Sequence, residues 1–283
     1  MKIPRFLLNR KPNTHKYDYG YVLVLGGSPG MIGAPSLCAK AALKIGAGMV
    51  RLGVPASLNN VAAKKLTEVM TLPLSEDKGY LCLKSFNDLK KVWDKADVLA
   101  IGCGASQEKS AQQFILKVVK AWNKKIVIDA DGLNALAGNL GILKGKNPQN
   151  LVLTPHAGEF YRLTKQMKSV IIKKKKELVK QFARRYNLTL VLKGNHTLVS
   201  EGKALFENIT GNPAMAKAGT GDVLTGIIAG LMAQGLNSFE AAKLGVYLHG
   251  LAGDLAAKDK TQMCLLASDI IDCLPKAIKS SPR

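Results

Sequence analysis

The sequence has few cysteines, and their arrangement is unlike that of a disulfide scaffold or a metal site. The chain contains 283 residues, of which five are cysteine, an odd number. They are scattered and stand mostly in apolar company, at Cys38, Cys82, Cys103, Cys264 and Cys273. A disulfide framework uses an even number of cysteines, and a structural zinc site needs close pairs such as CxxC. Neither is indicated, so we expect buried and reduced thiols.

Long apolar runs are also missing, although 47% of the residues are hydrophobic. Charged residues, glycine or proline interrupt every run before it reaches the roughly 18 to 20 residues that a membrane span requires. The N-terminal segment 1–13 has no apolar core of the kind found in signal peptides. The sequence therefore predicts a cytoplasmic protein with no membrane partner.

Acidic residues are scarce: 20 Asp and Glu face 41 Lys and Arg, which gives a formal net charge of +21. This charge favours binding to polyanions, so a nucleic-acid-binding module is one interpretation. Aromatic residues, however, make up only 6% of the chain, and no RNA-binding or zinc-finger pattern is present. The dense run Lys173 to Lys176 lies in a segment with apolar residues at helical spacing, namely Ile171, Leu178, Phe182 and Tyr186. We expect a solvated helix face there, no nucleic-acid partner, and a surface suited to phosphorylated small molecules.

Short apolar strands alternate with amphipathic helices along the chain. Strands are predicted at residues 21–26, 49–54, 97–102, 125–130, 150–155 and 189–194, and a hairpin around Gly202. Helices are predicted at 35–45, 111–122, 178–186, 223–232, 238–259 and 267–277. Strands that are apolar throughout are typical of a sheet covered on both faces. We expect a three-layer α/β/α sandwich with a central mostly parallel sheet, formed by one domain over 1–283, with 1–16 as a loosely ordered N-terminal extension.

The most informative motif is the glycine-rich stretch Ala218-Gly219-Thr220-Gly221-Asp222, directly before an apolar helix. Glycines let the backbone turn its N–H groups toward one point, and the helix adds the positive end of its dipole. The motif therefore predicts an anion site. Asp222 has two interpretations: it caps the helix, or it is a catalytic base next to a phosphoryl group.

Other polar residues follow predicted strands, where this architecture places ligands. Gly27, Gly30 and Gly33 follow the first strand without matching G-x-G-x-x-G, and no ribose-binding acid follows the second, so a Rossmann dehydrogenase is disfavoured. The glycine loop either wraps a phosphorylated substrate or is only a tight turn. Asp129 and Asp131 can hold Mg²⁺ through water, although Asp131 can equally cap a helix.

Further candidates follow the fifth and sixth strands. His156 can donate a hydrogen bond to a phosphate or ribose or can serve as a cap, and Glu159 suits a capping position. Lys193 and Thr197 offer an ammonium and a hydroxyl to nucleotide phosphates. His249 lies in an Ala- and Leu-rich segment and is interpreted as a packed, interhelical side chain.

Taken together, these motifs resemble a known family. GGSPGMIGA, IDADGLNAL, TPHAGEF, LKGNHT and GNPAMAKAGTGDVLTGIIAGLMAQG, followed by AAKLGVYLHGLAGDLAA, are similar to the ADP-dependent NAD(P)H-hydrate dehydratases of the ribokinase-like superfamily, over residues 17 to 278. The resemblance implies a homotetrameric lyase that converts (6S)-NADHX or (6S)-NADPHX and ADP into NADH or NADPH, AMP and phosphate. An epimerase domain, often fused N-terminally in this family, has no room here, so we expect the dehydratase alone.

The resemblance also implies roles for individual residues. Asp222 is the expected catalytic base, and the hydrate pocket is expected at Ala34, Gly104, His156 and Asp222. ADP is expected to contact Lys193, Gly194, Asn195, His196, Thr197, Gly219, Thr220 and Gly221. Mg²⁺ is expected to offset the phosphate charge, with ligands that the sequence does not identify. Ala218 stands where many relatives have glycine, which restricts the loop slightly.

A nearer alternative is an ATP-dependent kinase of a small alcohol, such as a thiazole or hydroxymethylpyrimidine kinase. It would use the same glycine loop and the same aspartate base. The motifs after the first and fifth strands argue against it.

Overall fold

Nine strands form one central sheet in the computed structural model, which describes residues 1–166 and 173–282. The strand order is β11-β10-β9-β8-β7-β6-β1-β2-β3. Neighbours from β9 to β3 pair in parallel, whereas β10 is antiparallel to β9 and to β11. The strands are β1 Tyr21–Leu25, β2 Met49–Pro55, β3 Met70–Leu74, β6 Val98–Ile101, β7 Lys125–Ile128, β8 Leu151–Leu153, β9 Thr189–Leu192, β10 Leu198–Ser200 and β11 Leu205–Glu207. A small separate hairpin joins β4 Glu76–Asp77 to β5 Tyr80–Leu81.

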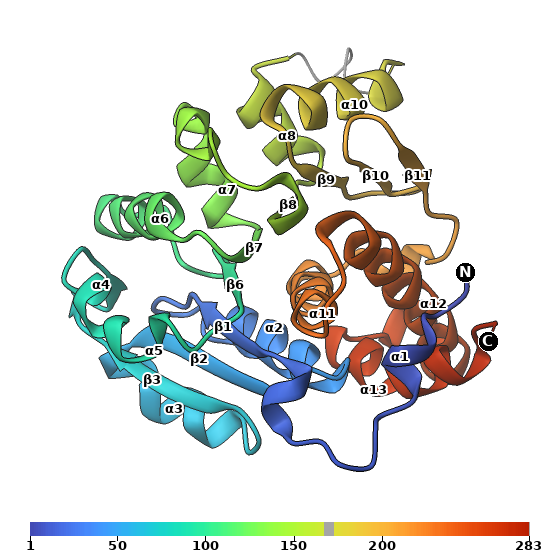
Figure 1. The fold of residues 1–283 in the computed structure, drawn as a ribbon, viewed down its shortest axis with the longest axis horizontal. Helices are drawn as coiled ribbons and strands as arrows, with labels where there is room; N and C mark the ends of the chain where they lie inside the picture. Colours follow the sequence, from blue (N-terminus) through green and yellow to red (C-terminus); the bar gives the residue numbers. More distant parts are fainter. Residues whose placement is uncertain (167–172, 283) are drawn as a thin grey trace.

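Helices cover both faces of this sheet, as Figure 1 shows. On one side lie α2 Gly33–Lys44, α3 Asn59–Lys65, α11 Thr220–Ala233, α12 Ser238–Cys264 and α13 Ala267–Ser280. On the other lie α4 Ser85–Asp88, α5 Lys90–Trp93, α6 Lys109–Ala121, α7 Asp131–Leu136, α8 Ala157–Thr164 and α10 Lys175–Tyr186. The short helix α1 Arg5–Leu8 precedes β1. The arrangement confirms the predicted three-layer α/β/α sandwich.

The strands are apolar because each face of the sheet belongs to a different core. In β1, Val22 and Val24 pack with the α2 and α11 side, and Leu23 and Leu25 pack with the α6 side. All four are completely buried. Alternate residues of one strand thus enter two cores, so apolar residues are favoured on both faces.

The six predicted strands and the hairpin are confirmed, but the sequence analysis missed β3 and the two short strands β4 and β5. β3 is an edge strand with the sequence MTLPL, and most of its residues are partly or fully exposed. Its Pro73 interrupts the apolar pattern, and an edge strand tolerates proline because one side needs no N–H donor. The predicted helix 238–259 is confirmed: α12 is regular up to a break in helical geometry at Thr261 (φ 69°), beyond which a short further piece extends to Cys264.

In the N-terminal segment 1–16, which we expected as a loosely ordered extension, the first eight residues contain α1 and pack on the core, whereas residues 9–16 are exposed. Ile3 is buried in the cluster on the α11 side, and Leu7 and Leu8 pack partly against it. The basic run is solvated as predicted, since Lys173, Lys174 and Lys176 are exposed. Leu178, Phe182 and Tyr186 pack against the opposite core, whereas Ile171 lies outside the described residues.

Cysteines are free and four of them are buried, as expected, but Cys264 is exposed near the end of α12. Over residues 1–166 and 173–282, every helix is too short or too polar to cross a bilayer.

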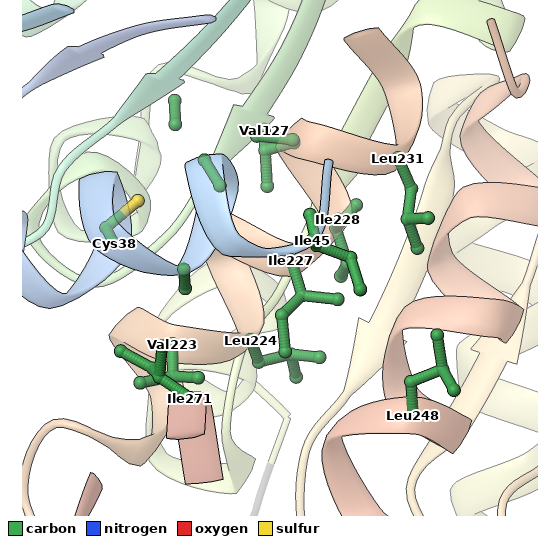
Figure 2. Packing of buried hydrophobic residues seen from close by; sticks show 14 of the residues in the cluster. Cys38, Ile45, Val127, Val223, Leu224, Ile227, Ile228, Leu231, Leu248 and Ile271 are labelled. Atoms are coloured by element: carbon green, nitrogen blue, oxygen red, sulfur yellow. The ribbon is translucent and has the colours of Figure 1, made fainter. Parts of the chain in front are cut away.

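Glycines bring α11 unusually close to α2. A Cβ at Gly226 would clash with the carbonyl oxygen of Cys38 and lie 2.9 Å from the Cβ of Ala41. One turn later, a Cβ at Gly230 would clash with the side chain of Ile45. Figure 2 shows Cys38 of α2, and Ile45 directly after α2, beside the α11 side chains that line this contact. The first turns of α11 lie beside the residues that follow β6 and β7, where Asp222 meets Cys103 and Thr225 meets Asp129.

Candidate active site

The first turn of α11 has the form of an anion site. The residue before the helix is Gly219, with φ of 93°, a conformation that favours glycine, and no side chain caps the helix. No side chain therefore satisfies the backbone N–H groups of the first turn, although Thr220 N donates to the carbonyl oxygen of Lys217 at 3.4 Å. The turn lies at the positive end of a 14-residue helix. Asp222 is the third helical residue and not the N-cap, so the capping interpretation of Asp222 is wrong.

Asp222 is electrostatically unusual. Burial, and then the nearby carboxylate of Asp129, raise the pKa of Asp222 from 3.8 to about 6, against the opposing effects of Cys103 and Lys193. A carboxylate with this pKa is ionised at neutral pH but holds a proton more strongly than an exposed aspartate. It therefore has the properties of a general base for chemistry near pH 7.

Asp129, directly after β7, is almost completely buried and accepts two hydrogen bonds. Lys193 Nζ donates to Asp129 Oδ1 at 2.6 Å, and Thr225 Oγ1 donates to Asp129 Oδ2 at 2.7 Å. Thr225 was missed by the sequence analysis. A signal was present, because it is the only polar side chain of the apolar helical segment from Val223 to Met232.

The predicted Mg²⁺ ligands are already engaged in other contacts. Asp131 accepts hydrogen bonds from Ser106 N at 2.8 Å and Asn134 Nδ2 at 3.1 Å, and Asp129 pairs with Lys193. No group of three or more His, Cys, Asp or Glu residues suited to a metal ion occurs in the part of the chain that the structure describes. A magnesium ion at Asp129 and Asp131 would share these carboxylates with the hydrogen-bond donors that they already have. Mg²⁺ can instead be held largely by nucleotide phosphates, which are common Mg²⁺ ligands.

His156 is the N-cap of α8. Its Nδ1 accepts from Gly158 N at 2.9 Å and Glu159 N at 3.3 Å, and Glu159 Oε2 accepts from His156 N at 2.8 Å. The capping interpretation of both residues is thus confirmed. Because Nδ1 accepts, the proton of the neutral ring lies on Nε2, 3.5 Å from Glu159 Oε1, and the ring is half-exposed. His156 therefore caps the helix with one nitrogen and keeps a donor on the other.

Residues 193–197 form a compact loop after β9. Thr197 Oγ1 donates to Gly194 O at 2.9 Å, and His196 adopts a left-handed backbone conformation with φ of 54°. From α10, Lys175 Nζ donates to the carbonyl oxygens of Asn195 and His196 at 3.1 and 3.2 Å. A depression of about 470 Å³ adjoins this loop, lined by Lys173, Lys174, Lys175, Lys176, Glu177, His196, Leu198 and Glu207.

The structure brings together several of the predicted site residues. A Cβ at Gly104 would lie 3.2 Å from that of Ala34, so these two neighbour one another. A Cβ at Gly221 would lie 3.3 Å from Lys193 Nζ, which joins the loop after β9 to the glycine loop. Lys193 Nζ also lies 3.9 Å from Glu159 Oε2, beside His156. His249 is packed as predicted, with Nε2 2.9 Å from the carbonyl oxygen of Thr220.

The fold and site define the chain as ribokinase-like. A ribokinase-like superfamily protein from Enterococcus faecalis, at 28% identity, superposes with a TM-score of 0.82 over 98% of this chain and 94% of its own. A kinase with the same architecture, hydroxyethylthiazole kinase from Pyrococcus horikoshii, has 17% identity and a TM-score of 0.65, which supports the fold alone.

Sequence comparison is more specific. The NAD(P)H-hydrate dehydratase family model matches residues 22–276, and the chain belongs to this family. The bifunctional NAD(P)H-hydrate repair enzyme Nnr of Moorella thermoacetica is 43% identical over 277 residues, 97% of this chain and 52% of that protein. The chain thus spans about half the length of the curated relatives that it matches. The ADP/ATP-dependent NAD(P)H-hydrate dehydratase of Bacillus subtilis, crystallised with ATP and Mg²⁺, is 32% identical, with a TM-score of 0.79 over 96% of this chain and 93% of its own.

Proposed function

We propose that this chain dehydrates (6S)-NADHX and (6S)-NADPHX with ADP as co-substrate, releasing NADH or NADPH, AMP and phosphate. Family membership supports the dehydration. The observation that carries the chemistry is Asp222, whose pKa is raised to about 6 in the first turn of a helix with no side-chain cap. The first turn of α11 thus carries both a base, Asp222, and the backbone N–H groups of an anion site.

The reaction begins with proton transfer. Asp222 accepts the proton of the C6 hydroxyl of the hydrate, and the hydroxyl oxygen attacks the β-phosphorus of ADP. The bond from phosphorus to the bridging oxygen breaks, and AMP leaves with that oxygen. The backbone N–H groups of Gly219, Gly221 and Asp222 face the phosphoryl group and stabilise the charge that it carries during transfer, whereas that of Thr220 donates to Lys217 O.

Elimination then restores the nicotinamide ring. Phosphate leaves from C6 with its bonding electrons, and a proton passes from C5 to water, so that the double bond between C5 and C6 forms. Phosphorylation is what makes this possible at neutral pH, because phosphate is a far better leaving group than hydroxide. Mg²⁺ bound to the nucleotide supplies positive charge to the phosphates. Ala34, Gly104 and His156 line the hydrate pocket, and residues 193–197 contact the adenylate.

One assay tests this proposal. Purified protein is incubated with chemically prepared hydrate, Mg²⁺ and either ADP or ATP, and the absorbance of the reduced nicotinamide is followed. We expect recovery with ADP and none without nucleotide, and the comparison with ATP matters because the Bacillus subtilis relative is described as ADP/ATP-dependent. A small-alcohol kinase would leave the hydrate unchanged with either nucleotide, and that result would overturn the proposal.

The Asp222→Asn variant tests the base. Asparagine keeps the size of the side chain but cannot accept a proton, so turnover should fall on the order of 10²- to 10⁴-fold. Binding of ADP should stay similar or tighten, since a negative charge beside the phosphates has gone. Near-normal turnover would remove Asp222 from the mechanism.

Two further properties extend the proposal. A homotetramer is proposed from the family resemblance and is checked by light scattering coupled to size-exclusion chromatography. A cytoplasmic location is proposed from the sequence and is checked by fractionation of cells.

A further inference from the structure

The ammonium of Lys193 occupies a defined point between three elements. Its Nζ lies 2.6 Å from Asp129 Oδ1, after β7, and 3.9 Å from Glu159 Oε2, on α8. On the α11 side, it lies 3.3 Å from the point that a Cβ on Gly221 would occupy. Because Gly221 has no side chain, the ammonium has room beside the N-terminus of α11, where the anion site is.

Asp129 rather than Glu159 determines where this ammonium lies. The distance to Asp129 is that of a hydrogen-bonded ion pair, whereas the distance to Glu159 is too long for a hydrogen bond. Burial alone would lower the pKa of Lys193, but Asp129 and Glu159 outweigh burial and raise it, so the ammonium keeps its charge. If Asp129 lost its charge, Glu159 would be the remaining carboxylate partner, and the ammonium would be drawn toward α8.

Thr225 fixes Asp129 in turn. Its hydroxyl donates to the second carboxylate oxygen at 2.7 Å, and its oxygen lies 3.2 Å from the carbonyl of Gly221, one turn earlier in α11. Thr225 is completely buried and Asp129 is 1% exposed. With one oxygen held by Thr225 and the other by Lys193, the carboxylate has little freedom to rotate. α11 thus orients, through Thr225 and Asp129, the cation that lies at its own N-terminus.

We propose that Asp129 and Thr225 are positioning residues of the reaction, which hold the Lys193 ammonium beside Gly221, where it meets the phosphoryl group during transfer. The inference rests on the proposed function, because it takes the glycine loop as the phosphate site. Asp129 and Thr225 act through Lys193 and do not themselves touch the reacting atoms. A cation placed in advance at the site of developing charge stabilises the transition state more than the ground state.

Thr225→Val is the first test, because valine keeps the shape of threonine and replaces only its hydroxyl by a methyl group. One hydrogen bond to a charged group corresponds to about a tenfold effect. We expect kcat to fall about tenfold with little change in the nucleotide KM, and Thr225→Ser to restore most of it. Thr189→Val is the matched control: Thr189 is also completely buried, and its hydroxyl contacts Ser238 at 2.8 Å, at the opposite end of β9. This control should leave kcat unchanged.

The pH profile of kcat/KM separates positioning from simple structural support. Asp222 is faced by Asp129 after β7, Cys103 after β6 and Lys193 after β9, with Glu159 of α8 behind Lys193. The carboxylate of Asp129 raises the pKa of Asp222 and the ammonium of Lys193 lowers it. Asp129→Asn should therefore move the acid limb to lower pH, and Lys193→Met should move it to higher pH. Two variants that break the same ion pair should thus shift the profile in opposite directions.

The outcomes are distinct. A wild-type chain that does not dehydrate the hydrate defeats the proposed function itself. An active wild type with an unchanged kcat in Thr225→Val, or with both acid limbs shifted the same way, overturns the positioning role while leaving the proposed function intact. Thermal unfolding of each variant shows whether it is folded at the assay temperature, and Thr225→Ser serves as the folded reference.

Discussion

The imidazole of His249, on α12, donates a hydrogen bond from Nε2 to the carbonyl oxygen of Thr220, the first residue of α11, at 2.9 Å. A carbonyl only accepts, so Nε2 carries the proton. Burial lowers the pKa of His249 from 6.5 to about 4, with the Thr220 contact opposing the shift. The ring therefore stays neutral at physiological pH and ties the glycine loop to α12.

Replacing His249 should destabilise the protein at neutral pH. His249→Phe keeps an aromatic ring but removes the donor to Thr220, so we expect a loss of about 1–2 kcal/mol in the free energy of unfolding. Chemical denaturation at pH 7.5 measures it. His15→Phe is the control, because His15 is exposed and distant in sequence from the glycine loop. Equal stability of wild type and His249→Phe would mean that the hydrogen bond contributes nothing.

The same variant should change how stability depends on pH. The unfolded chain binds a proton at His249 below about pH 6.5, whereas the folded chain does so only below about pH 4. His249 therefore makes stability fall as the pH drops from 6.5 to 4, by roughly 2–3 kcal/mol. His249→Phe should lose less stability than the wild type over this window, as measured by denaturation at several pH values. A steeper loss in the variant would contradict the shifted pKa.

Asp222 has the opposite effect on stability to His249: it destabilises the fold when the pH rises. Asp222→Asn should therefore stabilise the fold at neutral pH. The folded chain holds this proton up to about pH 6, and the unfolded chain releases it near 3.8. The free energy of unfolding is thus not reduced by Asp222 below pH 3.8, where the side chain is protonated in both states. It decreases as the pH rises through 6, because the buried side chain must then ionise. Ionisation of Asp222 lowers the free energy of unfolding by roughly 1–3 kcal/mol, after a discount for its partial exposure. Asp222→Asn should melt higher than the wild type at pH 8 and equally at pH 4, and a variant less stable at pH 8 would refute this.

The close contact of α11 with α2 should not tolerate a methyl group. Gly226→Ala places a Cβ against the carbonyl oxygen of Cys38, so the helices must separate, and we expect a loss of about 1–3 kcal/mol, typical of overpacking. Gly141→Ala is the control, since nothing lies within 4 Å of its added Cβ. Denaturant unfolding of both variants gives the comparison. Equal stabilities would show that the two helices can move apart without cost.

Lys175 should support nucleotide binding without taking part in the chemistry. Its ammonium bridges the carbonyl oxygens of Asn195 and His196, the second of which has a left-handed backbone. Lys175→Met should loosen the loop and raise the nucleotide KM several-fold, about the effect of one lost hydrogen bond to a charged group, with kcat unchanged. Lys180→Met, on the same helix, controls for the loss of charge. A change in kcat with a constant KM would be evidence against a role in binding.

Local patterns in the sequence were sufficient for most of the fold. Strands such as β1, apolar at every position, predict a sheet covered on both faces, and their alternation with helices predicts parallel order. The same local logic located the glycine loop before α11, because glycine spacing and an apolar helix are adjacent in the chain. It failed at β3, where Pro73 hides an edge strand, and at Cys264, whose exposure depends on where α12 ends.

The tertiary structure alone decided which polar side chains meet. Lys193 and Asp129 are 64 residues apart in the sequence. They pair because β7, β8 and β9 are neighbouring parallel strands, so the residues that follow β7 and β9 lie at the same end of the sheet. Thr225 reaches Asp129 from a third element, 96 residues away. Burial then sets the charges: it raises the pKa of Asp222 and would lower that of Lys193 without its carboxylate partners. Residue order specifies backbone conformation over a few positions, but desolvation and Coulomb energies depend on strand order and packing, which local patterns do not contain.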